Sequence, residues 1–363
     1  MTTVAIPATI AEVTAEWITI VLHEAGALPH DVPVTAIEVT RIGEGIGIMG
    51  DLYRVALDHP LATPASVVVK LPSAAEANRA QGVTLGMYDA EVRFYRDLAA
   101  TTRARTPECH LAVIVPGTAD SVLVLEDVSH LRMVNQADGM TADEAMLAVR
   151  ALAEVHGSWW GRVQTPDMEW IPSMVADRIQ GFAALYPQLV EPFLAKFADR
   201  LPPGGAELVT RVAEAYWPVM QRLASRPWTL VHQDFRVENL FFGRTPDDDQ
   251  LVILDWQTLG RGAATYDLSY LLGGSMDIEL RRATERELVA AYHARLVALG
   301  VDIGPDEVWD DYRLAHLAGG PAVSVLTGAT FDLANERGVE LVATMASRHL
   351  TACLDLDALE LLG

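Results

Sequence analysis

Two short apolar runs in the second half of the chain are each followed by polar residues that can accept a proton or bind a metal ion. The first leads into His232-Gln-Asp234, and Asn239 follows five residues after Asp234. The second, Leu251–Leu254, delivers Asp255 sixteen residues after Asn239. A positioned carboxylate can accept a proton from a hydroxyl group, and Mg²⁺ prefers oxygen ligands. We therefore predict that Asp234 and Asn239 form a catalytic loop and that Asn239 and Asp255 bind Mg²⁺.

Two polar residues near these motifs are expected to serve the structure. His232 is predicted to hold its loop by hydrogen bonds rather than to titrate during catalysis. Asp267 follows Tyr266 at the start of an apolar helical pattern, where a carboxylate caps a helix or anchors a loop. The residues 232–239 taken alone are also consistent with a hydrogen-bonded loop of no catalytic meaning.

A glycine cluster, Gly45-x-Gly47-x-x-Gly50, lies between two strand-like runs. Without a Cβ in the way, backbone N–H groups of such a loop can approach phosphate oxygens. A dinucleotide-binding loop would need a helix after the glycines, whereas the residues after Gly50 resemble a strand. A hairpin lid over nucleotide phosphates therefore fits better, although the cluster alone is equally consistent with a flexible turn.

Lys70 ends the apolar run Val67–Val69. A lysine at such a place is costly to bury unless it has an anionic partner. Glu91, on the helix expected next, is the best candidate, and Asp89 and Glu76 are its rivals. A lysine paired in this way can hold nucleotide phosphates. Taken alone, Lys70 is more simply explained as the end of a surface strand.

The composition limits the class of protein. The chain has 363 residues, 50% of them hydrophobic, and a net charge of -22, which fits a globular protein and disfavours nucleic-acid binding. The two cysteines cannot form a disulfide framework. Neither a basic leader nor an apolar run long enough to span a membrane is evident, so we expect a cytoplasmic protein without a membrane span. The oligomeric state is not specified by the sequence.

The hydrophobic periodicity divides the chain into two regions. Residues 1–126 predict an N-terminal lobe with a helix, a five-stranded antiparallel sheet and the nucleotide lid. Residues 127–363 predict a larger, mostly helical lobe that holds the catalytic loop and a substrate cleft. Thr141 and Glu144 have the spacing of a capping box. The individual elements expected are helices over 9–27, 74–100, 141–160, 170–200 and 205–224, strands near 37–43, 51–57, 65–71, 111–115 and 121–125, and further helices over 277–362.

With these motifs in this order, the chain resembles the aminoglycoside phosphotransferase superfamily, and within it the ecdysteroid-kinase-like small-molecule kinases. The resemblance rests on His232–Asn239 and Ile253–Trp256 and is supported by the glycine cluster and by Tyr266-Asp267-Leu. It covers residues 35–275. It implies a bilobal, protein-kinase-like fold of the α+β class.

The resemblance also implies a function. An enzyme of this kind moves the γ-phosphate of ATP to a hydroxyl group of a small molecule with the help of Mg²⁺, and Asp234 would be its base. Lys70, oriented by Glu91, would hold the ATP phosphates. The segment 125–128, with Glu126 and Val128, would bind adenine through its backbone. The metal would be held by Asn239 and Asp255.

Some residues depart from the patterns of relatives. Gln233 stands where many relatives have glycine, and Trp256-Gln257 replaces the Phe-Gly that follows the metal-binding Asp of protein kinases. The absence of an Arg before Asp234, and the short distance from Asp255 to Asp267, argue against a protein kinase.

Two questions remain open at the level of sequence. The alternative to a kinase is a non-catalytic nucleotide-binding or ligand-binding pseudokinase of the same fold, and an oxidoreductase is disfavoured by the strand after Gly50. The acceptor could be an aminoglycoside, a choline-like compound, a sugar, or a steroid or acyl alcohol. Residues 160–224 and 305–345 are expected to form its cleft, with Trp309, His316, Asp332 and Glu336 as candidate contacts.

Overall fold

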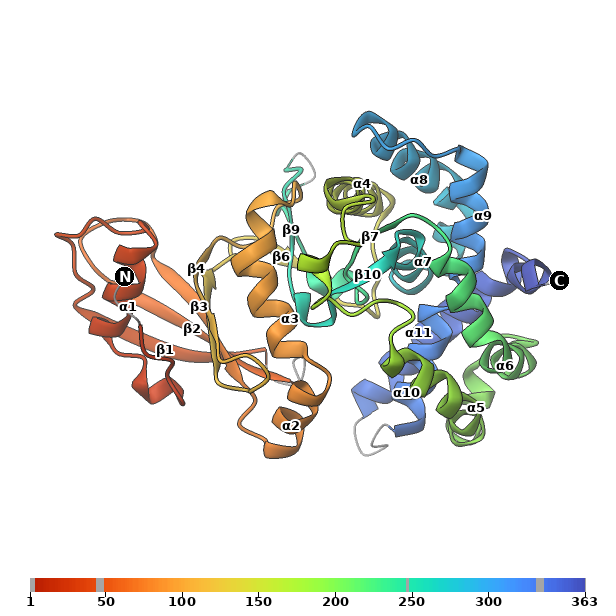
Figure 1. The fold of residues 1–363 in the computed structure, drawn as a ribbon, viewed down its shortest axis with the longest axis horizontal. Helices are drawn as coiled ribbons and strands as arrows, with labels where there is room; N and C mark the ends of the chain where they lie inside the picture. Colours follow the sequence, from red (N-terminus) through yellow and green to blue (C-terminus); the bar gives the residue numbers. More distant parts are fainter. Residues whose placement is uncertain (1–3, 44–48, 246–247, 331–335, 363) are drawn as a thin grey trace. The chain divides into compact units, whose positions relative to one another are not determined.

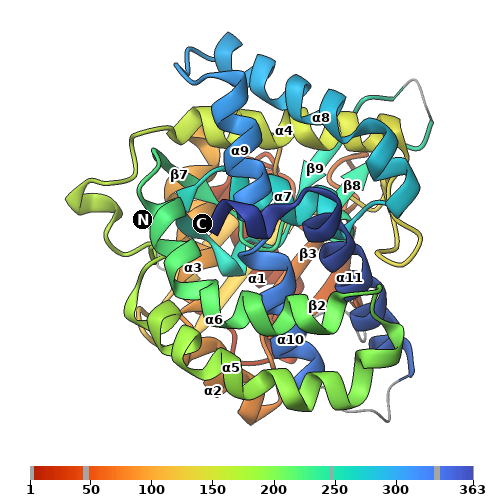
Figure 2. The same ribbon diagram turned by 90° about the vertical axis from the view of Figure 1, so that its right-hand side faces the viewer.

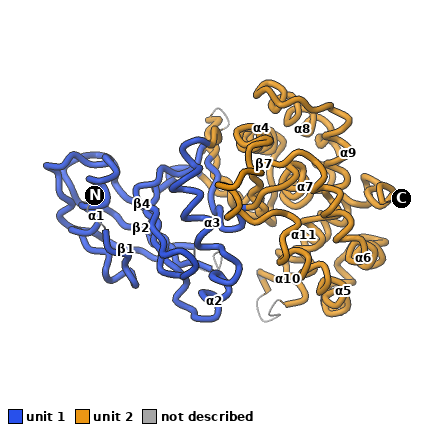
Figure 3. The backbone as a smooth tube through the Cα atoms, in the orientation of Figure 1, with its two compact units in different colours: residues 1–101, 105–131, 252–259 blue, residues 102–104, 132–251, 260–363 orange. Residues whose placement is uncertain are grey.

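The chain forms two compact units (Figures 1 and 3). Unit 1 contains the residues before Arg132, except 102–104, and the segment 252–259, while unit 2 contains the rest. A β-sheet dominates the N-terminal region and helices dominate the C-terminal part, which confirms the predicted α+β class. The domain boundary expected near residue 126 stays a prediction. The computed structural model describes residues 4–43, 49–245, 248–330 and 336–362.

Unit 1 is built on a five-stranded antiparallel sheet with the strand order β1-β2-β3-β5-β4. Its strands coincide with runs rich in branched residues, which favour extended backbone. The register places Lys70 opposite Leu52 on one side and Leu123 on the other. The strands are β1 (Ala36–Ile42), β2 (Gly50–Asp58), β3 (Ser66–Pro72), β4 (Cys109–Ile114) and β5 (Ser121–Glu126).

Different helices cover the two faces of this sheet (Figure 1). Helix α1 (Ala15–Glu24) packs on one face and shares a core with alternate residues of β3 and β5. Because side chains alternate along a strand, Val69 and Leu71 face α1 and Lys70 points to the opposite face. Helix α3 (Met87–Arg93) covers that face, so the alternation of β3 brings Lys70 to α3.

The single helix expected over residues 74–100 is wrong, because the structure divides this segment. Helix α2 (Glu76–Thr84) ends before Gly86, which has a φ of 68° and takes the left-handed conformation that glycine adopts easily. Helix α3 then continues into a π turn (Phe94–Leu98) and a short 3-10 turn (Ala99–Thr101). The direction of the chain therefore changes immediately before the helix that carries Glu91.

Unit 2 consists mainly of helices and short antiparallel strand pairs, β6 with β8 and β7 with β10. The side chains of Thr141 and Glu144 form the predicted capping box at the start of α4. Strand β9 (Leu251–Ile253) leads into the segment of Asp255. The elements of unit 2 are β6 (Arg132–Met133), α4 (Ala142–Trp159), α5 (Asp177–Phe197), α6 (Gly205–Ala224), β7 (Trp228–Val231), β8 (Leu240–Phe242), β10 (Gly260–Ala263), α7 (Thr265–Gly274), α8 (Ile278–Ala298), α9 (Pro305–Ala315), α10 (Gly319–Thr330) and α11 (Glu336–Asp355).

The main core of unit 2 lies among α5, α6, α9, α10 and α11 (Figure 2). Aromatic rings fill much of it. Phe193 and Phe197 stack with ring centroids 5.3 Å apart, and Tyr186 meets Tyr216 edge to face. Although these helices have apolar inner faces, none of the helices within the described ranges has the length and hydropathy of a membrane-spanning segment.

Two histidines, His316 and His349, are buried in this core, and each is only 1% exposed. The packing is tight, since a Cβ at Gly320 would lie 2.1 Å from His349 Nδ1. Burial first, and then the positive charge of Arg281, holds the pKa of His316 well below its usual value. Burial and the charge of Arg348 lower the pKa of His349 to about 3. Both imidazoles are therefore neutral in the folded chain at neutral pH.

We predict that acid destabilises the chain through these two histidines. The unfolded chain binds protons at each of them below about pH 6.5, whereas the folded chain does so only at much lower pH. Stability is fully present above that pH, and below it the free energy of unfolding falls by about 1.4 kcal/mol per pH unit for each histidine. Urea unfolding across the range from neutral pH to about pH 5 measures this slope.

The variant His349→Gln separates this effect from other titrations. Because it removes one of the two neutral imidazoles, its free energy of unfolding should fall less steeply below pH 6.5 than that of the wild type. Equal slopes in the two proteins would contradict the assignment.

Candidate active site

In unit 1, one lysine ammonium lies between two carboxylates. Lys70 Nζ lies 2.8 Å from Glu91 Oε1 and 3.3 Å from Asp255 Oδ1. Strand β3 supplies the lysine, α3 supplies the glutamate, and the segment after β9 supplies the aspartate. Of the three acids considered as partners from the sequence, Lys70 thus contacts Glu91 rather than Asp89 or Glu76. Three predicted site residues therefore meet within one unit.

Burial and charge set the protonation of this cluster. The side chains of Lys70 and Glu91 are 13% and 5% exposed, whereas that of Asp255 is 37% exposed. Burial raises the pKa of Glu91 to about 7, and the charge of Lys70 opposes that rise only in part. Burial alone would lower the pKa of Lys70, but the charges of Asp255 and Glu91 outweigh it and raise the pKa. Lys70 therefore stays an ammonium, and Asp255 is the carboxylate that a metal ion can reach.

The residues around Asp255 are held in a defined conformation. Asp255 has a φ of 61°, and Gln257 Nε2 donates a hydrogen bond of 2.5 Å to its Oδ1. Trp256 is fully buried and stacks on Phe94, with ring centroids 3.7 Å apart and planes inclined by 9°. Phe94 begins the π turn that continues α3, so the stack joins the segment of Asp255 to the helix of Glu91. Sequence reasoning missed Phe94, although its place three residues after Glu91 on a helical pattern was an available signal.

The glycine cluster is only partly described. Gly45 and Gly47 lie outside the described residues. Gly50 begins β2, and a Cβ at this position would lie 3.2 Å from both Leu71 O and Lys70 Cε. This close approach leaves little room for a residue larger than glycine at position 50. The role of the three glycines as a phosphate lid stays a prediction.

The predicted adenine-binding segment at the end of β5 is tied to its neighbours. Glu126 Oε1 lies 2.9 Å from Arg105 Nη2. The side chain of Val128 is buried, and its carbonyl accepts a hydrogen bond from Leu131 N at 2.9 Å. The backbone path of the segment is therefore fixed, while its contact with adenine stays a prediction.

In unit 2, the buried strand β7 leads into the loop that carries Asp234, and one carboxylate holds that loop. Asp267 accepts hydrogen bonds from His232 N at 2.6 Å and from Gln233 N at 2.8 Å. His156 Nε2 lies 3.2 Å from the same carboxylate. Asp267 is fully buried in the first turn of α7, so it anchors the loop, which is one of the two structural roles predicted for it.

Asp234 and Asn239 meet in this loop. Asn239 Nδ2 donates to Asp234 O at 2.8 Å and to Asp234 Oδ2 at 3.0 Å. Because its amide nitrogen is engaged, the amide oxygen of Asn239 is the atom suited to a metal ion. Burial first, and then the charge of Asp234 together with a hydrogen bond to it, raises the pKa of Tyr270. Asp234 itself is 28% exposed, so a substrate hydroxyl can reach it.

Gln233 is held in the left-handed region, with a φ of 65°. This backbone conformation favours glycine and costs other residues about 1 kcal/mol. The hydrogen bond from Gln233 N to Asp267 keeps the chain in this conformation. The side chain lies against Gly260 of β10, where a Cβ would come 2.7 Å from Gln233 Cδ. Gln233 therefore has a strained backbone conformation, and this conformation sets the direction of the chain at Asp234.

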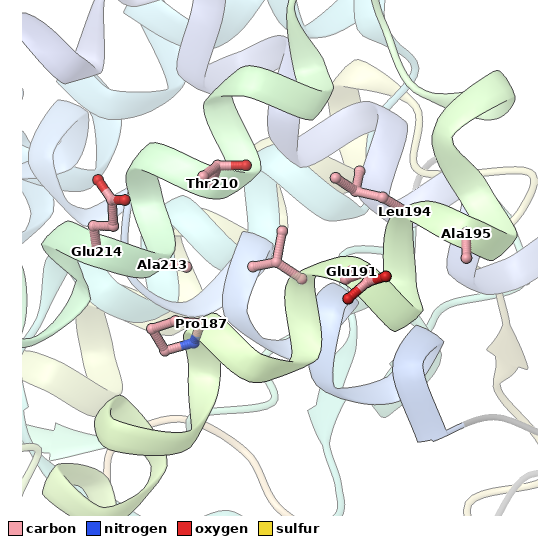
Figure 4. Close-up of a pocket in the computed structure, with 8 residues that line it drawn as sticks. Pro187, Glu191, Leu194, Ala195, Thr210, Ala213 and Glu214 are labelled. Carbon is pink, nitrogen blue, oxygen red and sulfur yellow. The ribbon is translucent and has the colours of Figure 1, made fainter.

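A groove of about 460 Å³ lies between α5 and α6 in unit 2 (Figure 4). It falls within residues 160–224, one of the two segments expected to form the acceptor cleft, but no residue of the predicted catalytic loop lines it. His316, a candidate acceptor contact, is buried in the core instead, and Asp332 lies outside the described residues. The location of the cleft stays a prediction. The groove is lined by Pro187, Val190, Glu191, Leu194, Ala195, Thr210, Ala213 and Glu214.

We predict that Gln233→Gly is more stable than Gln233→Ala by about 1 kcal/mol in the free energy of unfolding. Both variants lose the side-chain contact with Gly260, but only alanine keeps a Cβ at a positive φ. Urea unfolding of the two variants at neutral pH measures the difference. Equal stability, or a more stable alanine variant, would show that the position is not strained.

Several solved structures share the fold. A choline kinase from Cryptosporidium parvum Iowa II has 10% identity and a TM-score of 0.61, with 94% of this chain and 97% of that chain covered. A spectinomycin phosphotransferase solved with ADP and spectinomycin has 12% identity and a TM-score of 0.55, with 96% and 99% covered. A putative aminoglycoside phosphotransferase from Ralstonia eutropha JMP134 has 11% identity and a TM-score of 0.54, with 93% and 97% covered. These likenesses confirm the protein-kinase-like fold.

Family membership rests on a different comparison. No curated protein matches the chain. Residues 45–303, however, match the model of the Ecdysteroid kinase-like family, and this range contains both the Lys70 cluster and the Asp234 loop. Because the match covers well over half of the chain, the chain belongs to the Ecdysteroid kinase-like family.

Proposed function

We propose that the chain transfers the γ-phosphoryl group of ATP to a hydroxyl group of a small molecule in a Mg²⁺-dependent reaction. The observation that carries this proposal is the contact of Lys70 with both Glu91 and Asp255, because a buried ammonium held in this way suits the binding of phosphate oxygens. Membership of the Ecdysteroid kinase-like family supports the proposal. So do neighbours of the same fold that are choline kinase and aminoglycoside phosphotransferases.

In the proposed reaction, unit 1 binds the nucleotide. The Lys70 ammonium neutralises phosphate charge, and Glu91 keeps it oriented. Gly45, Gly47 and Gly50 cover the phosphates, while the backbone of Glu126 and Val128 contacts adenine. The chemistry needs no covalent intermediate on the protein, because positioning and neutralisation of charge suffice for phosphoryl transfer.

The Asp234 loop acts on the acceptor. The carboxylate of Asp234 takes the proton of the substrate hydroxyl as its oxygen attacks the γ-phosphorus and the bond to the leaving ADP breaks. Asn239 orients this carboxylate through its amide nitrogen, and its amide oxygen and the Asp255 carboxylate are the groups that would hold the metal ion. Bound Mg²⁺ supplies neutralisation of the charge on the phosphate oxygens.

Two measurements distinguish a kinase from a non-catalytic pseudokinase. Titration calorimetry with Mg-ATP tests nucleotide binding, and ADP release in the presence of alcohols, sugars, choline and aminoglycosides tests turnover. A kinase shows both binding and acceptor-dependent ADP release. Tight Mg-ATP binding without ADP release on any hydroxyl compound would favour the pseudokinase, and absence of binding would contradict both.

We predict that Asp234→Asn lowers the turnover number by roughly 10²- to 10⁴-fold, because the amide cannot accept the hydroxyl proton. The affinity for Mg-ATP should stay near that of the wild type, since Asp234 does not bind the nucleotide in this proposal. ADP release and calorimetry measure the two quantities. The exposed Asp167→Asn is the matched control in the same unit and should change neither. Turnover within a few-fold of the wild type in Asp234→Asn would remove the base assignment.

We predict that Asp255→Asn instead weakens the Mg²⁺-dependent part of nucleotide binding by at least about tenfold, because a direct metal ligand is lost. Titration calorimetry with ATP in the presence of Mg²⁺ and of EDTA isolates that part. Asp97→Asn is a matched control, since the carboxylate of Asp97 is 36% exposed against 37% for Asp255. Unchanged dependence on Mg²⁺ in Asp255→Asn would exclude Asp255 as a ligand.

A further inference from the structure

Arg236, two residues after Asp234, lies between two carboxylates of its own loop. Its Nε is 3.3 Å from the Asp234 carboxylate, and its Nη1 bonds to Glu238 Oε2. The side chain of Arg236 is 16% exposed, and that of Glu238 is 6% exposed. A guanidinium group is planar and presents several N–H donors in fixed directions, so it can fix one carboxylate relative to another. Asp234 is therefore linked to a buried residue through a rigid group.

Glu238 is in turn fixed by a residue from another part of unit 2. Glu238 Oε1 accepts a hydrogen bond from Gln136 N at 3.2 Å. Gln136 is fully buried, and its Nε2 donates to Gly274 O at 2.9 Å and to Ser275 Oγ at 3.2 Å. Ser275 Oγ also accepts from Val237 N at 3.1 Å. The loop of Asp234 is thus bonded to the C-terminal end of α7 from two sides.

Arg348 on α11 completes this chain of contacts. Its Nη1 donates to Gln136 O at 2.7 Å, and its Nη2 donates to Ala137 O at 2.8 Å. Its guanidinium group also reaches Gly274 O at 3.3 Å, and only 8% of the residue is exposed. Buried donors that each have a partner form a stiff network. The order of contacts from the core outward is therefore Arg348, Gln136, Glu238, Arg236 and Asp234.

We infer that Arg236, in addition to Asn239, is a positioning residue of Asp234, and that Glu238 fixes Arg236 to the core. This inference rests on the proposed function, because it concerns the group that accepts the hydroxyl proton. Asn239 and Tyr270 also hydrogen-bond to this carboxylate. Arg236 adds a charged contact that is itself fixed through Glu238, which restricts the carboxylate to one of its staggered conformers. A displacement of a reacting group by about 1 Å can cost roughly 10²-fold in rate.

The experiment compares Arg236→Gln with Arg236→Lys and with a matched arginine. Arg226 also pairs with a buried carboxylate, that of Asp311, at 2.8 Å, and this pair joins the turn between α6 and β7 to α9. Hydrolysis of Mg-ATP with water as the acceptor gives kcat and KM, and calorimetry gives the affinity for Mg-ATP. Crystal structures of the wild type and of Arg236→Gln give the orientation of the Asp234 side chain.

We expect Arg236→Gln to lower kcat by about 10- to 100-fold and to change the affinity for Mg-ATP by less than about twofold. Arg236→Lys should recover part of the loss, because it keeps the charge but not the planar fork. Arg226→Gln should leave kcat within about twofold even if it lowers Tm. A kcat of Arg236→Gln within about twofold of the wild type, or an equal fall of kcat in Arg226→Gln, would overturn the inference.

A double-mutant cycle with Glu238→Gln tests the transmission from the core. This variant keeps an oxygen for Gln136 N but loses the ion pair with Arg236. The double variant Arg236→Gln, Glu238→Gln should have a kcat no lower than that of Arg236→Gln alone. If the two reductions in kcat multiply in the double variant, the claim that Glu238 acts through Arg236 is overturned. If Arg236→Gln does not fold, the kcat values of Arg236→Lys and Glu238→Gln still test the positioning role of Arg236.

Failure of the proposed kinase function can be distinguished from failure of the positioning role of Arg236. A wild-type protein that binds but never hydrolyses Mg-ATP, and never phosphorylates an acceptor, counts against the kinase. In that case the crystal structures alone decide the positioning role. An Asp234 side chain that keeps its wild-type orientation in Arg236→Gln overturns the inference, and a rotated one supports it.

Discussion

The ammonium group of Lys70, shared between Glu91 and Asp255, is the interaction on which the nucleotide half of the proposed site depends. An ionised group taken out of water costs several kcal/mol unless a partner of opposite charge compensates it. The Lys70 ammonium therefore compensates the two carboxylates, and the two carboxylates in turn keep Lys70 charged. The sheet and α3 provide this arrangement, because the alternation of β3 turns Lys70 away from the α1 core and toward Glu91. The stack of Trp256 on Phe94 then ties the third member to the same helix.

In unit 2, a buried carboxylate holds the loop that carries Asp234 in place. Asp267 is fully buried, and two backbone N–H groups and an imidazole surround it. Hydrogen bonds of this kind to a charged acceptor are stronger than those between neutral groups. They hold Gln233 at a positive φ and so fix where the next residue, Asp234, leaves the loop. The more exposed Asp234 is therefore presented by a framework that is itself rigid.

The sequence was sufficient for features that depend on local pattern. The five strands, the capping box at Thr141 and the approach of Asn239 to Asp234 follow from alternation, capping chemistry and short spacing. The partner of Lys70 could also be predicted, because Glu91 lies in the helical segment expected after its strand, although this segment is divided and Glu91 belongs to α3, the second of its helices.

Features that depend on contacts between distant parts of the chain could not be predicted from local sequence pattern. The break at Gly86 and the π turn after Arg93 depend on how α3 fits the sheet, which periodicity does not report. The contacts of Glu238 with Gln136, and of Gln136 with Arg348, join segments about 100 residues or more apart along the chain. Nothing in the loop motif itself distinguishes Arg236 from a solvated charge. The acceptor is similarly undetermined, because a shared fold serves many substrates.

The most direct test of the proposed phosphoryl transfer follows the γ-phosphate itself. ATP labelled with ³²P at the γ position is incubated with the wild-type chain, Mg²⁺ and a panel of hydroxyl compounds, and the products are separated by chromatography. A kinase with Asp234 as its base should form a labelled organic phosphate with at least one compound, and Asp234→Asn should not. Label that stays in ATP or appears only as inorganic phosphate, across the whole panel and despite tight binding of Mg-ATP, would contradict the proposed transfer.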